Sequence, residues 1–125
     1  MLQQEPKTMT KALGRHLLLE LYECPSEILN DTGIIQQIMI DVAKAVHATI
    51  IDTSFHHFSP FGVSGVVLIA ESHFTIHTWP EYGYAAVDIF TCDEELNHEK
   101  SKALLIERFA AKRHQSKFIL RGEIE

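Results

Sequence analysis

The sequence has no hydrophobic run long enough to cross a membrane, no excess of basic residues, and only two cysteines. A membrane-spanning helix needs about 20 consecutive apolar residues, so we expect no membrane partner. Lys and Arg together number 11 against 17 Asp and Glu, which gives a formal net charge of −6. Because phosphate backbones bind basic surfaces, we expect no nucleic-acid partner either.

The two cysteines, Cys24 and Cys92, lie in no CxxC motif. A zinc cluster therefore has no support, and we expect no metal. The first residues of the chain lack the basic and apolar regions of a signal peptide. We therefore expect a cytoplasmic protein, in which both thiols stay reduced.

A length of 125 residues predicts a single domain with a hydrophobic core of its own. Residues 1–13 are mostly polar and are interrupted by Pro6, which predicts a loose N-terminal extension. Residues 14–125 then form the domain.

Two kinds of hydrophobic periodicity run along this domain. Alternating or continuous apolar segments predict strands, and apolar residues at three- and four-residue steps predict helices. The predicted strands are residues 15–22, 49–58, 65–70, 74–78, 84–92 and 116–123, and the predicted helices run from Asp31 to about residue 46 and over residues 97–112. This order predicts an α+β two-layer sandwich, in which two helices cover one face of a mainly antiparallel sheet.

The other face of the predicted sheet carries histidines and aromatic residues. Along residues 73–79, for example, the alternation places His77 and Trp79 on one face and Phe74 and Ile76 on the other. An uncovered sheet face of this kind is rarely left in water. We therefore expect this face to meet a second copy of the chain, giving a homodimer with four layers.

The second predicted helix should bury Ala103, Ile106, Phe109 and Ala110, which recur at helical spacing. The acidic run 93–95 before it is most simply a solvated cap, because carboxylates stabilise the N-terminus of a helix.

The stretch Glu71-Ser72-His73, read together with His77 and Cys92, contains the groups that a protein needs to cut its own backbone. The Ser72 hydroxyl can attack the carbonyl carbon of Glu71 and convert the peptide bond into an ester. Loss of the Ser72 α-proton, with His77 as the candidate base, then expels the Glu71 carboxylate. The dehydroalanine that remains hydrates, loses ammonia and becomes a pyruvoyl group. The products would be the chains 1–71 and 72–125.

A covalently bound pyruvoyl group derived from Ser72 has one main chemical use. Its ketone condenses with a substrate amine to a Schiff base and withdraws electrons from the neighbouring carbon, so that CO2 can leave. The carbanion must then be reprotonated, and the thiol of Cys92 can serve as the proton donor.

Three motifs resemble the prokaryotic S-adenosylmethionine decarboxylase proenzymes. They are Gly62-Val63-Ser64-Gly65-Val66-Val67, the run Glu71-Ser72-His73-Phe74-Thr75-Ile76-His77-Thr78-Trp79-Pro80-Glu81-Tyr82-Gly83, and Asp88-Ile89-Phe90-Thr91-Cys92. The resemblance covers roughly residues 13–92, and the central motif is highly specific. One departure is that the family usually has glycine after the cysteine, where this chain has Asp93.

The resemblance implies a role for each matching residue. Glu71–Ser72 is the cleavage bond, Ser72 the pyruvoyl precursor, His77 the proton acceptor in processing and Cys92 the proton donor in decarboxylation. Ser64 matches a serine that assists processing. Phe58 falls where the family stacks an aromatic residue on adenine, and Trp79 and Glu81 lie beside the same substrate site. The implied activity converts S-adenosylmethionine to its decarboxylated form and CO2 for spermidine biosynthesis.

Three alternatives stay open at this point. Relatives with the same self-processing core act on other amino acids such as arginine, so the reaction type is better defined than the substrate. A thiol hydrolase could use Cys92 and His77, with Asp88 on the same face as Cys92. An uncleaved, non-catalytic regulatory homologue would keep the fold without the chemistry.

Overall fold

The computed structural model describes residues 11–124. Its elements are β1 (Lys11–Tyr22), α2 (Ser26–Leu29), α3 (Thr32–Ala45), β2 (Ile50–His57), β3 (Val63–Ile69), β4 (Ser72–Trp79), the 3-10 helix η1 (Pro80–Tyr82), β5 (Tyr84–Thr91), α4 (His98–Arg108) and β6 (Arg113–Ile124). Because β1 begins at Lys11, the last three residues of the expected extension belong to a strand. Residues 1–10 of that extension lie outside the described part of the chain.

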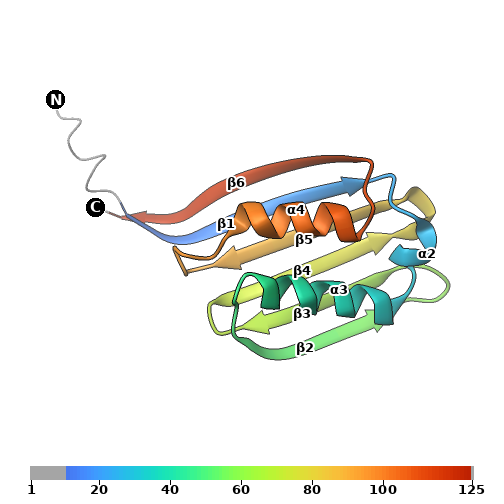
Figure 1. Cartoon of the computed structure of the whole chain (residues 1–125), viewed down its shortest axis with the longest axis horizontal. Helices are drawn as coiled ribbons and strands as arrows, with labels where there is room; N and C mark the ends of the chain where they lie inside the picture. Colours follow the sequence, from blue (N-terminus) through green and yellow to red (C-terminus); the bar gives the residue numbers. More distant parts are fainter. Residues whose placement is uncertain (1–10, 125) are drawn as a thin grey trace.

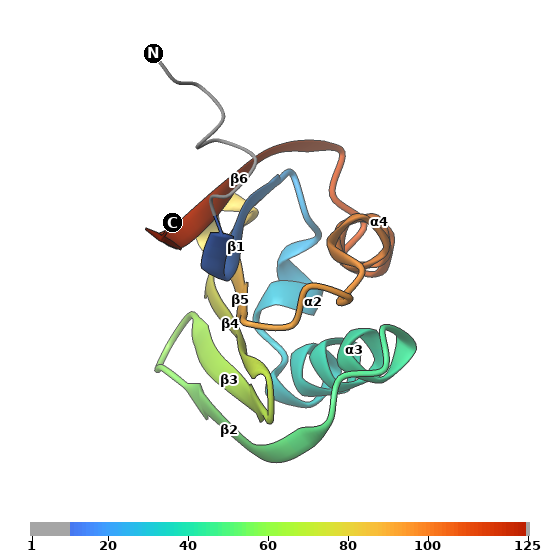
Figure 2. The same cartoon turned by 90° about the vertical axis from the view of Figure 1, so that its left-hand side faces the viewer.

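The six strands form one sheet in the order β2-β3-β4-β5-β1-β6 (Figure 1), and every neighbouring pair is antiparallel. Figure 2 shows the helices on one side of this sheet, while its other face carries no helix. The predicted α+β two-layer sandwich is therefore confirmed. We call the uncovered side, which carries His16, His73, His77 and Asp88, the open face.

The hydrophobic core lies between the sheet and the helices. Leu17, Leu19 and Leu21 of β1 are buried, as their alternation predicts. They pack in one cluster with the apolar stripe of α3, which includes Ile35 and Met39. The side chain of Asp31 caps α3 by accepting a hydrogen bond from the Ile34 amide at 3.0 Å.

The helix α4 follows the predicted burial only in part: Phe109 is buried as predicted, and Ile106 packs partly buried against the core. Ser101, Leu105 and Phe109 are buried, whereas Ala103 and Ala110 are exposed. The buried residues follow a four-residue step, which gives a narrow contact stripe on a helix at the flank of the core. Small side chains such as alanine tolerate either environment, so their position in the sequence could not identify this stripe.

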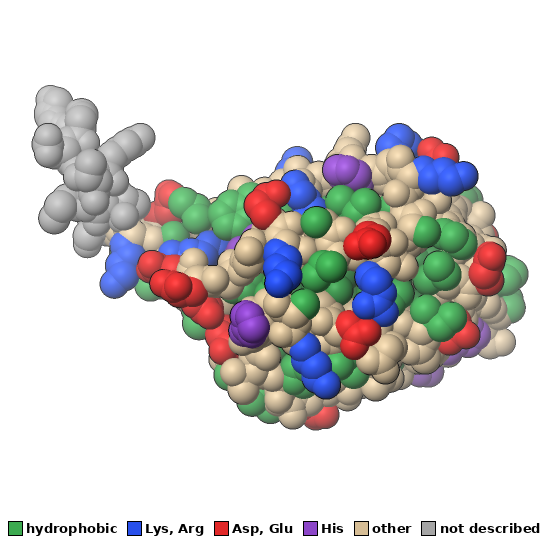
Figure 3. Space-filling model, viewed as in Figure 1, with side chains coloured by type: hydrophobic (Ala, Val, Ile, Leu, Met, Phe, Trp, Pro, Cys, Tyr) green, Lys and Arg blue, Asp and Glu red, His purple; other side chains and the backbone are tan. Residues whose placement is uncertain are grey.

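The strand β6 is exposed along its whole length, because it lies at the edge of the sheet beside β1. On the helix-bearing side, acidic and basic side chains are mixed with apolar ones (Figure 3). The strongest clustering of histidines with aromatic rings instead occurs on the open face, where both His16 and His73 contact Phe90.

Phe109 offers a test of this packing. Replacing it with alanine should lower the free energy of unfolding by about 3–5 kcal/mol, since a fully buried aromatic side chain is lost and a cavity remains. The matched control is Phe61→Ala, at a position that is 54% exposed, which should cost far less. Urea unfolding followed by circular dichroism measures both. Equal losses would contradict the assignment of Phe109 to the core.

Candidate active site

The Glu71–Ser72 peptide bond lies at a tight turn between two paired strands. Ile69 of β3 pairs with Ser72 of β4, so Ala70 and Glu71 alone connect them. Ser72 has a φ of 153°, a region that residues other than glycine rarely adopt. Such backbone strain costs on the order of 1–3 kcal/mol and persists only where the surroundings enforce it. The strain therefore falls on the bond that the sequence predicts to be cut.

Cys92 binds the carbonyl oxygen of that same bond. Its amide N–H donates to the Glu71 carbonyl oxygen at 3.0 Å, and its thiol Sγ lies 3.4 Å from the same oxygen. Attack on the Glu71 carbonyl carbon would place negative charge on this oxygen. Two donors already aimed at it form an oxyanion site, in which one donor contributes roughly 2.7–4 kcal/mol at well-studied enzymes.

The Glu71 residue is also held from the side of β2. Its carboxylate Oε1 accepts a hydrogen bond from the Thr49 amide at 3.2 Å, and the Ala70 amide donates to the Thr49 carbonyl at 2.8 Å. The turn is therefore fixed through Thr49 on one side and through Cys92 on the other. This double attachment explains how the strained φ at Ser72 is maintained.

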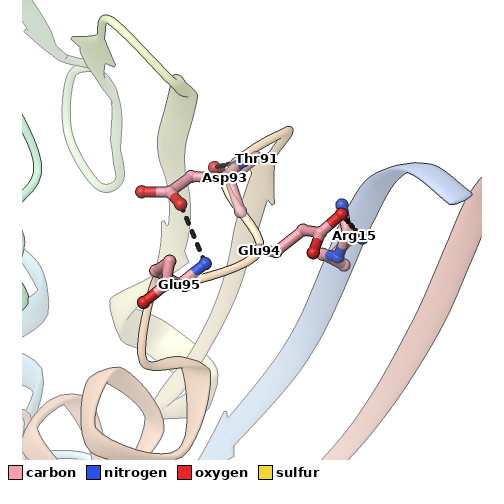
Figure 4. A network of polar contacts seen from close by, with 5 residues as sticks. All are labelled: Arg15, Thr91, Asp93, Glu94 and Glu95. Carbon is pink, nitrogen blue, oxygen red and sulfur yellow. Dashed lines mark hydrogen bonds and ion pairs between the residues drawn. The ribbon is translucent and has the colours of Figure 1, made fainter.

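The acidic residues of the loop after Cys92 form polar contacts that hold this loop in place (Figure 4). The buried hydroxyl of Thr91 accepts from the Asp93 amide at 2.9 Å, and the Asp93 carboxylate accepts from the Glu95 amide at 2.8 Å. Arg15 of β1 forms an ion pair with Glu94 at 3.3 Å. We call these contacts the Cys92 loop network.

This network corrects the prediction that the acidic run is a solvated helix cap. The side chain of Asn97 caps α4 by accepting from the Lys100 amide at 2.9 Å. The run 93–95 precedes this cap, and its contacts hold the loop that follows Cys92. Sequence reasoning missed Arg15 and Thr91, because their partners become neighbours only when β1 and β5 pair.

A second polar group lies further along the open face. Ser64 of β3 is directly opposite His77 of β4, and the Ser64 hydroxyl oxygen is 2.9 Å from His77 Nδ1. The serine thereby orients the imidazole ring and leaves Nε2 available for proton transfer. Both residues line an open hollow of about 300 Å³, together with Ser54, Val66 and Thr75.

The structure separates this pair from the cleavage bond. Ser72 and His77 lie on the same strand, and five residues of extended chain span roughly 16 Å. A general base must approach to about 3 Å of the proton that it removes. Within a single chain, His77 therefore does not reach Ser72, while Cys92 contacts the Glu71 carbonyl directly.

The three predicted substrate-binding residues lie at the His77 end of β4. Phe58 is 49% exposed and meets His56 edge to face, at 4.5 Å between ring centroids. Trp79 is 42% exposed and packs against Tyr84, with a centroid distance of 5.2 Å. Glu81 lines a separate hollow of about 370 Å³ beside α2. Phe58 and Trp79 therefore lie on the exposed surface, whereas Glu81 lines the hollow beside α2.

Asn30, in the segment between α2 and α3, is a further residue whose contacts the sequence did not indicate. Its side-chain oxygen accepts from the Gly62 amide at 3.0 Å and lies 2.9 Å from His57 Nε2, and its Nδ2 donates to the Pro60 carbonyl at 3.4 Å. Asn30 therefore fixes the turn between β2 and β3 that begins with Phe58. Nothing in the sequence links Asn30 to a turn 30 residues away.

The two thiols have opposite environments. Cys24 is buried, and its burial raises its pKa to about 11, so it stays protonated at neutral pH. Cys92 is exposed.

Among residues 11–124, no group of three metal-binding side chains comes together. No helix in this described range is long and apolar enough to cross a membrane.

The Cys92 loop network predicts a graded effect on backbone cleavage. Glu94→Gln should slow cleavage at Glu71–Ser72 roughly twofold to fivefold, because a partly exposed ion pair contributes up to about 1 kcal/mol. The matched control is Glu95→Gln, since Glu95 enters the network through its backbone amide alone (Figure 4). Time courses of intact mass measure both rates. Identical rates for the two variants would contradict a role for Arg15–Glu94.

Comparisons with known proteins identify the family. The family model for S-adenosylmethionine decarboxylase matches residues 15–122. The S-adenosylmethionine decarboxylase proenzyme of Thermodesulfovibrio yellowstonii is 57% identical to this chain over 101 residues. The alignment covers 81% of this chain and 75% of that protein. The Acetivibrio thermocellus proenzyme is 51% identical over 114 residues, or 91% and 92% of the two chains. The crystal structure of the Aquifex aeolicus adenosylmethionine decarboxylase superposes with a TM-score of 0.86 at 34% identity, covering 92% of this chain and 95% of that one. The chain belongs to the S-adenosylmethionine decarboxylase family.

Proposed function

We propose that this chain is a self-processing proenzyme whose product decarboxylates S-adenosylmethionine. The observation that carries the proposal is the strained Ser72 backbone next to a carbonyl that already receives the amide and thiol of Cys92. Membership of the family supplies the reaction, since its relatives are named as proenzymes of this decarboxylase.

Cleavage begins when Ser72 Oγ attacks the Glu71 carbonyl carbon and the C–N bond breaks, which leaves an ester. The Cys92 donors stabilise the charge on the carbonyl oxygen during this step. A base then removes the Ser72 α-proton, the ester C–O bond breaks, and Glu71 leaves as a carboxylate. Water adds to the resulting dehydroalanine and ammonia departs. The products are chains 1–71 and 72–125, the second beginning with a pyruvoyl group.

The residues around Ser72 fit such a group. It would remain at the start of β4, beside Cys92, where its carbonyl would supply an electron sink for decarboxylation of an amine substrate. Cys92 is exposed on the open face, so its thiol can hold a proton at Sγ and deliver it to the carbon that loses CO2. The buried Cys24 has neither the position nor the exposure for this role.

The proton acceptor in processing comes, in this proposal, from a second copy of the chain. His77 and Ser64 lie roughly 16 Å along the sheet from Ser72, beyond the reach of any rotamer. A homodimer formed through the open faces brings Ser72 and Cys92 of one subunit to Ser64 and His77 of the other. Twofold symmetry then creates two such sites and the four-layer assembly.

Phe58 and Trp79 are our candidates for binding S-adenosylmethionine, and they would act from the same subunit as His77. Exposed aromatic rings can stack on adenine and face the sulfonium cation, an interaction worth about 0.5–2 kcal/mol. Glu81 remains a candidate for the ribose hydroxyls. It points into the hollow beside α2, so this role would require its side chain to turn.

The proposed cleavage is tested by intact mass. The wild-type chain should separate into two fragments that meet at Glu71/Ser72, with the second fragment lighter than its serine form, and the sample should release CO2 from S-adenosylmethionine. Ser72→Ala lacks the attacking hydroxyl and should stay in one piece and release none. A wild-type chain that remains uncut after long incubation would refute the proposal.

The shared site is tested by mixing two inactive variants. His77→Ala keeps Ser72, and Ser72→Ala keeps His77, so neither should be cut alone at the wild-type rate. Co-expression should restore cleavage of the His77→Ala chains, because their Ser72 meets the His77 of the other variant. The control partner is the double variant Ser72→Ala/His77→Ala, which should restore nothing. Equal cleavage with both partners would rule out sharing.

A further inference from the structure

The two segments that carry the candidate substrate-binding residues are connected by one short piece of chain. Phe58 begins the turn between β2 and β3, whereas Trp79 and Glu81 lie where β4 continues into η1. Residues 26–30, which we call the α2 segment, form hydrogen bonds with both regions. Figure 1 shows α2 at this same end of the sheet. The α2 segment can therefore set the distance between the two groups of side chains.

Phe58 lies just beyond the paired part of its strand. The ladder between β2 and β3 ends with His57 opposite Val63, so Phe58 is the first residue outside it. The Phe58 amide donates to the Gly62 carbonyl at 2.8 Å, and the buried Gly62 amide donates to the side-chain oxygen of Asn30 at 3.0 Å. Two hydrogen bonds through Gly62 thus connect Asn30 to the backbone of Phe58.

The side-chain amide of Asn30 has one orientation that fits its neighbours. The Gly62 N–H can only donate and the Pro60 carbonyl can only accept, so the oxygen faces Gly62 and Nδ2 faces Pro60. The Nε2 of His57, 2.9 Å from the same oxygen, must then donate as well. Both lone pairs of this oxygen are occupied, so Asn30 has no acceptor left for a ligand hydroxyl.

The α2 segment is also attached to the end of β4. The buried Thr78, next to Trp79, donates its hydroxyl to the Leu29 carbonyl at 2.7 Å and accepts from the Val63 amide at 2.9 Å. Two consecutive residues, Leu29 and Asn30, therefore bind the end of β4 and the turn between β2 and β3. Because the attachments are adjacent in the chain, the two regions have little freedom to move apart.

We propose that Asn30 is a positioning residue for substrate binding, which holds the Phe58 ring at the distance from Trp79 and Glu81 that one S-adenosylmethionine molecule requires. This inference rests on the proposed function, because it assigns a geometry to the substrate site named there. A hollow of about 370 Å³ supports it, since Asn30, Phe61 of the turn and Glu81 of η1 line it together. Without the Asn30 side chain, the turn loses its attachment to α2.

The first test is the substitution Asn30→Ala. It should raise KM for S-adenosylmethionine about twofold to thirtyfold, the range that loss of one aromatic contact with the ligand allows. It should change kcat little, because Ser72 begins the opposite end of β4 from Thr78. Initial rates of CO2 release, divided by the amount of cut chain seen by intact mass, measure both constants. An unchanged KM would overturn the proposal.

Two matched variants separate positioning from general loss of stability. Asn30→Asp keeps an oxygen acceptor for the Gly62 amide and loses only the donor to Pro60, so its KM should stay near that of wild type. Asp31→Ala removes a hydrogen bond of similar length from the next residue, which caps α3, and should lower stability without raising KM. Equal increases in KM for Asp31→Ala and Asn30→Ala would contradict a specific role of Asn30.

A double-mutant cycle tests whether Asn30 acts through Phe58. Phe58→Ala should raise KM at least as much as Asn30→Ala does, and the double variant should have the KM of Phe58→Ala alone. This result is expected because a misplaced ring cannot be lost twice. If KM instead rises by the product of the two separate factors, Asn30 acts independently of Phe58 and the proposal is wrong.

Hydrogen exchange followed by NMR tests the contact without catalysis. The Gly62 amide should exchange slowly in wild type and in Asn30→Asp, and faster in Asn30→Ala, while amides in the middle of β3 keep their protection. Equal protection of Gly62 in all three proteins would overturn the link from α2 to Phe58. A cut wild-type chain that protects Gly62 but releases no CO2 from S-adenosylmethionine would refute the proposed function, and the substrate role of Asn30 with it.

Discussion

The antiparallel pairing of β4 with β3 on one side and β5 on the other determines where all the proposed chemistry can occur. Pairing with β5 places the amide and thiol of Cys92 on the carbonyl of Glu71. Pairing with β3 places Ser64 on His77. Because an extended strand has a fixed rise per residue, these two groups cannot approach each other in one chain. The rigidity of a single strand therefore divides the site into two halves.

The layers of the fold were predictable because their signals are local. Leu17, Leu19 and Leu21 alternate as a half-buried strand must, and the structure buries all three. The face of α4 was not predictable from its alanines, because Ala103 is small enough to be stable in water or in the core. There, tertiary packing selected the line of Ser101 and Leu105.

The components of the candidate site were predictable in kind, but their arrangement was not. Ser72, His77 and Cys92 stand out in the sequence because their functional groups suit self-cleavage and match a known motif. That Cys92 contacts Glu71, and that His77 does not approach Ser72, follows from register, which the sequence does not state. The partners Arg15 and Glu94, 79 positions apart, likewise meet only through the sheet.

The strand order has a consequence for what happens after the backbone is cut. The piece ending at Glu71 would contain β1, β2 and β3, and the piece starting at residue 72 would contain β4, β5 and β6. In the sheet, β2 and β3 of the first piece are followed by β4 and β5 of the second, then by β1 of the first and β6 of the second. Three hydrogen-bonded strand pairs, β3–β4, β5–β1 and β1–β6, therefore join the two pieces. The polypeptides are interleaved, and neither can leave without dismantling the sheet. Cleavage between Glu71 and Ser72 would therefore leave both pieces held in one sheet.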